Sequence, residues 1–137
     1  MSAVLLDTTV VSAMRRLDDN AALRSWLARH DAADFRISTV TEMELLAGVM
    51  KLERRDPGQG LALRAWFERM MAQFEGKILS FDSPSARWAA SIGLIRTRGL
   101  ADTQVAGIAL AAGMPLATLN RKDFDDIPGL TLVDLAA

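Results

Sequence analysis

Short apolar runs alternate with amphipathic stretches along the chain. Residues 3–6 are continuously apolar and end at Asp7, which is typical of a buried parallel strand followed directly by a helix. Further short strands are predicted at residues 35–38, 77–81, 114–119 and 131–133. Apolar positions at helical spacing predict helices over residues 10–17, 21–29, 39–55, 61–74, 83–98 and 100–112.

Strands that alternate with helices predict an α/β fold with a mostly parallel central sheet of about five strands flanked by helices. The 137 residues are few enough for a single domain, residues 1–137. The clearest break is residues 56–60, rich in glycine and containing a proline, and we expect a helix–helix loop there.

The composition excludes several kinds of chemistry. Without cysteine the chain has no disulfide and no thiolate metal site, and its one histidine, His30, excludes a two-histidine site. A net charge of −1 gives no overall sign of a nucleic-acid-binding protein, so contact with a polyanion needs local basic patches or metal ions. No apolar run approaches the ~18 residues of a membrane span, and no signal peptide is recognisable, so we expect a soluble, cytoplasmic protein.

Several oxygen-bearing side chains fall where elements of an α/β fold meet. Asp7 follows the first strand, and Asp102 lies at the start of a helix; each is also a good helix N-cap. Glu44 has small or apolar neighbours one helical turn away on either side, and a carboxylate on such a face needs a partner. Asn120 and Asp123 follow the fourth predicted strand, where a plain polar turn is the alternative.

In a parallel α/β fold these positions converge at the carboxyl ends of the strands, where ligands bind. Carboxylates brought together repel one another unless a cation lies between them. Mg²⁺ and Mn²⁺ take oxygen ligands and suit phosphate chemistry, in which they activate water and neutralise developing charge. The sequence therefore predicts a divalent-metal site.

Four segments together resemble the PIN-domain ribonucleases, and the length resembles the toxin of a VapBC-type toxin–antitoxin pair. The segments are LLDTTVVS at 5–12, SxxTxxELxxG at 38–48, DxxxAxxA at 102–109 and TxNxxDF at 118–124. The resemblance implies a Mg²⁺-dependent endoribonuclease that cleaves tRNA or another structured RNA. It also implies inhibition by a small VapB-like antitoxin and a homodimeric state.

When the family's functional positions are matched to this sequence, the resemblance implies that Asp7 and Asp102 are direct metal ligands. Glu44 binds the metal through water or orients the nucleophile. The fourth acidic position of the family falls on Asn120, and Asp123 is close enough in sequence to take its place. Smaller departures are Thr9, where the family often has Asn, and Gly107, where it usually has Ala; neither removes a carboxylate.

Other functions fit less well. A receiver domain would want an acidic pair after the first strand, and a haloacid-dehalogenase phosphatase would want a second aspartate at Thr9. A catalytically silent PIN-like module that binds RNA or protein remains the main alternative. RNA contacts are expected among the cations Arg15, Arg16, Lys51, Arg54, Arg55, Arg96, Arg98, Arg121 and Lys122. Trp66, Phe67, Met70, Met71 and Phe74 are expected mostly in the core, the exposed remainder suiting an antitoxin or a second copy.

Overall fold

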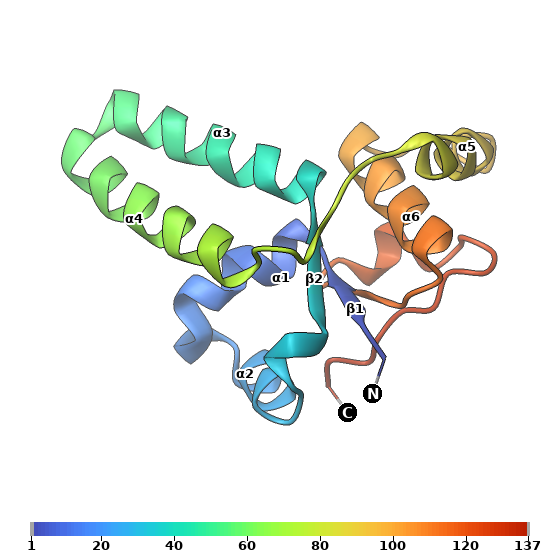
Figure 1. The fold of residues 1–137 in the computed structure, drawn as a ribbon, viewed down its shortest axis with the longest axis horizontal. Coiled ribbons are helices and arrows are strands. Elements are labelled where there is room, and N and C mark those ends of the chain that lie inside the picture. Colours follow the sequence, from blue (N-terminus) through green and yellow to red (C-terminus); the bar gives the residue numbers. More distant parts are fainter. Residues whose placement is uncertain (1, 137) are drawn as a thin grey trace.

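The computed structural model describes residues 2–136 and has a parallel sheet at its centre (Figure 1). Its strands are β1 (Val4–Leu6), β2 (Phe35–Ser38), β3 (Ile78–Leu79) and β4 (Leu116–Ala117), in the order β3-β2-β1-β4. The helices are α1 (Thr8–Ala13), α2 (Ala21–Ala28), α3 (Thr39–Arg55), α4 (Pro57–Gln73), α5 (Ser83–Ile92) and α6 (Leu100–Ala112). The predicted α/β fold class is confirmed.

Alternate residues of β1 face two separate parts of the core. Val4 and Leu6 pack with residues of α1, α2, α3 and α4, whereas Leu5 packs with residues of α5, α6 and β4. All three side chains are buried, which explains why the strand is apolar without interruption. The α3–α4 hairpin and the α5–α6 pair accordingly lie on opposite sides of the sheet (Figure 1).

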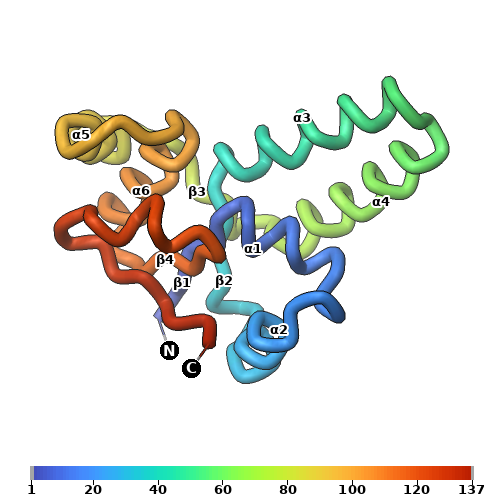
Figure 2. Tube along the Cα trace, turned by 180° about the vertical axis from the view of Figure 1, so that it is seen from behind, coloured from blue at the N-terminus to red at the C-terminus, as the bar shows by residue number. Residues whose placement is uncertain are grey.

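The predicted fifth strand is reduced to a single bridge in the described residues. Leu116 bridges Leu132 in parallel, through hydrogen bonds from Leu116 N to the Thr131 carbonyl (2.9 Å) and from Val133 N to the Leu116 carbonyl (2.9 Å). The sheet thus has four strands. Seen from behind, the segment after β4 crosses the edge of the sheet and reaches the beginning of α1 (Figure 2).

The predicted loop at residues 56–60 is wrong, because only Asp56 separates α3 from α4. Asp56 Oδ1 accepts a hydrogen bond from Gln59 N (3.1 Å) and caps α4, whose first residue is Pro57. Proline suits a first helical turn, where the backbone N–H has no helical partner. At Gly60 an added Cβ would lie 2.6 Å from Glu53 Cα, so glycine allows the two helices to approach closely.

Two predicted helices are shorter than expected. The helix predicted over 83–98 ends at Ile92, and residues 97–99 adopt no regular structure before α6. The helix predicted over 10–17 divides into α1 and a 3₁₀ segment, Met14–Asp19. Among residues 2–136, no helix combines the length and the apolar character that crossing a membrane requires.

Two helical glycines are expected to respond oppositely to alanine. At Gly107 an added Cβ would lie 2.5 Å from the Ser85 carbonyl oxygen, so α5 and α6 must separate at a cost of about 1–3 kcal/mol. That cost is at least as large as the gain of about 1 kcal/mol that alanine brings over glycine in helix propensity. Nothing lies within 4 Å of the corresponding position at Gly48, where alanine keeps that gain. Urea unfolding should show Gly48→Ala to be the more stable variant, and the reverse order would contradict this packing.

Candidate functional site

Asp7 lies at the end of β1, where it caps α1 and is also a buried carboxylate. Its Oδ1 accepts from Val10 N (3.1 Å) and Thr9 Oγ1 (2.5 Å), and its Oδ2 accepts from Thr118 Oγ1 (2.5 Å). The side chain is 4% exposed, and burial raises the pKa of the carboxyl although these hydrogen bonds oppose the rise. The two interpretations from the sequence, cap and site residue, therefore describe the same side chain.

Glu44 projects from the second turn of α3 and is exposed, with a single threonine as its described partner. Thr8 Oγ1 donates to Glu44 Oε1 (2.6 Å) and also lies 3.0 Å from Thr41 Oγ1. Thr8 and Glu44 form one end of a groove of about 210 Å³, which continues past Gly48 to Trp66 on α4. Of the residues one helical turn from Glu44, Gly48 borders this groove, whereas Val40 and Thr41 are buried.

Asp102 lies in the first turn of α6 and is partly buried. Its pKa is raised first by burial and then by the negative charges of three other residues: Asp123, Asp7 and Glu44. Among the described residues the Arg98 guanidinium opposes this rise. Four carboxylates from four separate segments thus lie close enough for their charges to act at one position.

Asn120 and Asp123 contact each other in the turn that follows β4. Asn120 Nδ2 donates to Asp123 Oδ2, and Asn120 N donates to Thr118 Oγ1 (3.0 Å). The amide of Asn120 therefore orients the carboxylate of Asp123, which carries the charge that acts on Asp102. In this arrangement Asp123 supplies the fourth carboxylate, and Asn120 holds it.

Threonines that the sequence did not single out connect these groups. The buried Thr118 donates to Asp7 and accepts from Asn120, and Thr9 Oγ1 accepts from Leu119 N (3.0 Å). These bonds tie the end of β1 to the end of β4. The sequence signal for Thr118 was its place at the end of an apolar strand, directly before the polar turn.

The donor set fits a hard divalent cation in its chemistry. All the candidate ligands are carboxylate oxygens, and a cation among them would relieve the repulsion that raises the pKa of Asp102. Within residues 2–136, no three acidic or histidine side chains already stand together as a closed ion site. Binding therefore requires side-chain rotation, for which the exposed Glu44 has room.

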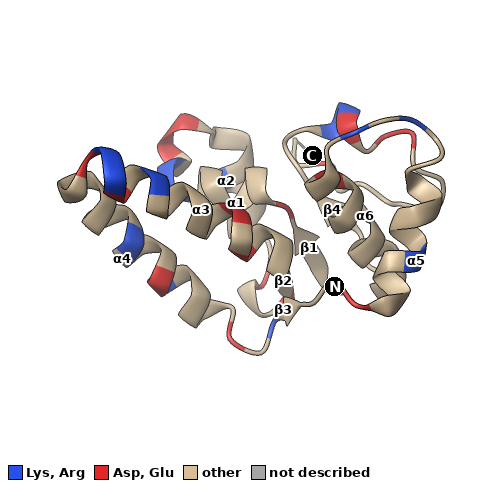
Figure 3. Ribbon diagram, turned by 90° about the horizontal axis from the view of Figure 1, so that it is seen from above, with Lys and Arg blue, Asp and Glu red and all other residues tan. Residues whose placement is uncertain are grey.

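Six of the nine predicted RNA-contacting cations fall into two groups. Arg98 is only 2% exposed and binds Asp126, so its prediction as an RNA contact is wrong. Arg96 also binds Asp126, and Arg121 donates to the Val133 carbonyl (2.7 Å). Other basic residues follow one another along the last turns of α3, at the tip of the α3–α4 hairpin (Figure 3): Lys51, Arg54 and Arg55, all exposed.

The apolar side chains of α4 lie largely as expected. Phe67, Met70 and Phe74 are buried in the core, whereas Trp66 and Met71 are half-buried. Trp66 lines the groove beside Glu44. Trp66 is therefore the half-buried side chain of this pair that lies beside Glu44, whereas Met71 lines a separate cavity with Glu68 and Ile78.

Comparisons with known proteins agree with this geometry. The PIN domain profile matches residues 4–130. The chain is 31% identical over 140 residues to the plasmid stability protein StbB of Pseudomonas syringae pv. tomato, covering 96% of each. It is 34% identical over 118 residues to toxin FitB of Neisseria gonorrhoeae, covering 86% of this chain and 81% of FitB.

A shorter match and a solved structure add to these. Ribonuclease VapC14 of Mycobacterium tuberculosis is 38% identical over 64 residues, 47% of this chain and 62% of VapC14. The crystal structure of FitAcB from Neisseria gonorrhoeae superposes with a TM-score of 0.84 at 27% identity, covering 96% of this chain and 97% of that one. The similarity thus extends over the whole fold.

Proposed function

The chain belongs to the PIN-domain family, and from this premise we propose that it is a Mg²⁺-dependent endoribonuclease, the toxin of a VapBC-type toxin–antitoxin pair. The observation that carries the proposal is the convergence of charge on Asp102 from Asp7, Glu44 and Asp123. Carboxylates held near one another repel, so a cation or a substrate that joins such a cluster relieves that repulsion. The relatives named as a ribonuclease and a toxin support the same activity.

The proposed role of each acidic residue follows from how exposed its side chain is. Asp7 and Asp102 are proposed as direct metal ligands, since both are at least partly buried and fixed on β1 and α6. Glu44 is accessible at the groove and is proposed to hold or orient the attacking water, while Asp123, held by Asn120, completes the set of acids. When bound, Mg²⁺ or Mn²⁺ would activate water and neutralise charge on the phosphodiester.

The proposed partners follow from the surface. The groove between Thr8 and Trp66 includes Glu44 in its lining, so an antitoxin segment seated there could place a basic side chain beside that carboxylate. Large exposed apolar side chains, among them Met43, Met50, Leu94 and Leu100, suit a homodimer. We propose structured RNA, such as tRNA, as the substrate and the cytoplasm as the location.

Cleavage of total cellular RNA by the purified, antitoxin-free chain tests the activity. With Mg²⁺ or Mn²⁺ we expect discrete fragments, whose ends identify the target by end-mapping, and with EDTA we expect none. Fragments that persist in EDTA would remove the metal from the proposal. A folded chain that cuts nothing with either ion would favour the catalytically silent PIN-like binding module instead.

A further inference from the structure

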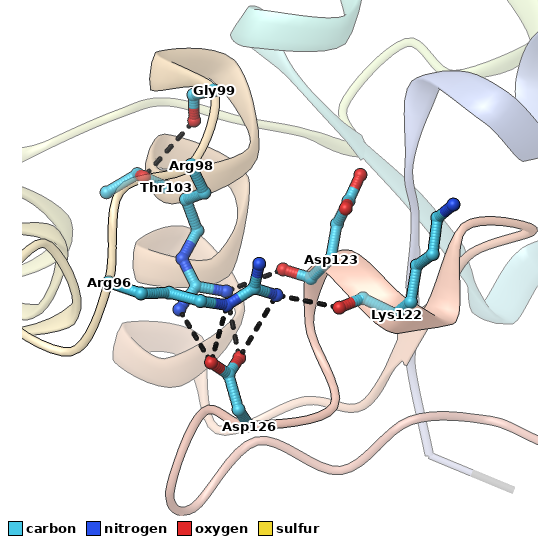
Figure 4. A network of polar contacts seen from close by, with 7 residues as sticks. All are labelled: Arg96, Arg98, Gly99, Thr103, Lys122, Asp123 and Asp126. Carbon is cyan, nitrogen blue, oxygen red and sulfur yellow. Dashed lines mark hydrogen bonds and ion pairs between the residues drawn. The ribbon is translucent and has the colours of Figure 1, made fainter.

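Two arginines from the segment between α5 and α6 bind one aspartate in the loop that follows β4 (Figure 4). Arg98 donates from Nη1 to Asp126 Oδ1 (3.0 Å) and from Nη2 to Oδ2 (3.4 Å). Arg96 donates from Nε to Asp126 Oδ2 (2.6 Å) and from Nη2 to Oδ1 (3.5 Å). Asp126 thus accepts from two guanidinium groups at once, and they lower its pKa to about 2.

The same arginines also bind the backbone of the turn that carries Asp123. Arg96 Nη2 donates to the Lys122 carbonyl (2.7 Å), and Arg98 Nη1 donates to the Asp123 carbonyl (2.6 Å). Residues Arg121–Asp123 form a 3₁₀ turn, whose last carbonyls have no partner within the turn. The guanidinium groups supply those partners from another part of the chain.

Burial distinguishes Arg98 from the arginine of an ordinary surface ion pair, whereas Arg96 and Asp126 are 41% and 33% exposed. The Arg98 side chain is 2% exposed, whereas Arg24 and Asp18, an ordinary surface pair, are 55% and 98% exposed. A charge buried to this degree needs a partner, and the two Nη atoms of Arg98 have theirs, whereas its buried Nε has no hydrogen-bond partner among the described residues. Arg98 also directly precedes α6, the helix that carries Asp102.

We propose that Arg96, Arg98 and Asp126 form a clamp that positions the turn of residues 120–123, and with it the Asp123 carboxylate, against Asp7 and Asp102. The clamp residues are positioning residues and touch no substrate. They act on Asp123 through its backbone, and Asn120 fixes the Asp123 side chain. The expected effect of the clamp on cleavage rests on the proposed nuclease activity, but the effect of the clamp on the turn can be measured without that activity.

The first test is hydrogen exchange of the metal-free protein with Asp126→Asn. The variant should exchange the amides of residues 120–126 at least about tenfold faster, with exchange in α2 and α4 unchanged. Glu53→Gln is the matched control, because Glu53 accepts a similar fork from Arg64 (2.6 and 3.0 Å) in the α3–α4 hairpin. Unchanged exchange at residues 120–126 would overturn the clamp, whether or not the chain cleaves RNA. If Asp126→Asn does not fold, Arg96→Gln, which leaves the Arg98 fork intact, replaces it.

The second test is a double-mutant cycle on cleavage. Asp126→Asn should lower kcat by about 10- to 100-fold in the wild-type background, with Glu53→Gln within about twofold of wild type. In an Asp123→Asn background the same change should cost less than about threefold, since the positioned group is already gone.

Equal losses in both backgrounds, or a fully active Asp123→Asn, would show that the clamp does not act through Asp123. If Asp123→Asn leaves no measurable cleavage, the exchange experiment decides. A wild-type chain that never cleaves refutes the proposed function and leaves the exchange result standing.

Discussion

Asp7→Asn is expected to lower RNA cleavage by at least about 1000-fold while the protein remains folded. Loss of a direct metal ligand removes several kcal/mol of transition-state stabilisation, and about 4 kcal/mol corresponds to a factor of 1000. Asparagine is nearly the same size, and its remaining oxygen can still accept from Val10 N and Thr9 Oγ1. Thr118 Oγ1 can turn to accept from the new amide, so the contact with β4 can also be kept.

The matched control for this substitution is Asp82→Asn. Asp82 caps α5 as Asp7 caps α1, since its Oδ1 accepts from Ser85 N (3.0 Å) and Ser85 Oγ (2.6 Å). Both variants should remain folded, but only Asp7→Asn should lose cleavage, measured as kcat with saturating Mg²⁺. An active Asp7→Asn would leave Asp7 as a helix cap alone.

The parts of the fold that depend on neighbouring residues could be predicted from the sequence. The apolar run at residues 3–6 with Asp7 behind it gave β1 and its capped helix, because both signals lie within a few residues. The start of α4 was missed because Pro and Gly were interpreted as a loop, although proline also begins helices and Gly60 allows close contact with Glu53. That contact joins two helices and has no local signature.

The acidic residues of the candidate site could be proposed from the sequence, whereas the side chains that hold them in place could not. Asp7 and Asp102 were proposed because they stand where a strand ends and where a helix begins, and Glu44 because its neighbours one helical turn away are small or apolar. Thr118 was missed because its bond to Asp7 spans 111 residues. Arg98 was assigned to RNA because nothing near it in the sequence indicates Asp126, its partner 28 residues later.

Asp102→Asn is expected to change activity and stability in opposite directions. Cleavage should fall about 100- to 1000-fold, because a proposed metal ligand is lost. The free energy of unfolding in metal-free buffer should rise, because a partly buried carboxylate is removed and the charges of Asp123, Asp7 and Glu44 no longer act against it. A residue whose removal stabilises the fold while abolishing function is typical of a binding site kept at a cost in stability.

The stability gain should depend on pH with a definite sign. The pKa of Asp102 is raised above its usual 3.8, so the folded state binds this proton more tightly than the unfolded state does. The stability contributed by Asp102 is fully present below the usual pKa and is lost as pH rises through the raised pKa. Asp126 behaves oppositely, since its pKa is lowered to about 2 and its contribution is lost as pH falls toward that value. Only the difference between wild type and variant isolates the effect of Asp102.

Urea unfolding in EDTA at about pH 4 and about pH 7.5 measures that difference. The stability advantage of Asp102→Asn over wild type should be larger at about pH 7.5 than at about pH 4. Adding Mg²⁺ at pH 7.5 should then stabilise wild type more than the variant, since a ligand that binds only the folded state raises its stability. If Mg²⁺ instead stabilises both proteins equally, Asp102 does not contribute to the ion site, and its raised pKa reflects burial and neighbouring charge alone.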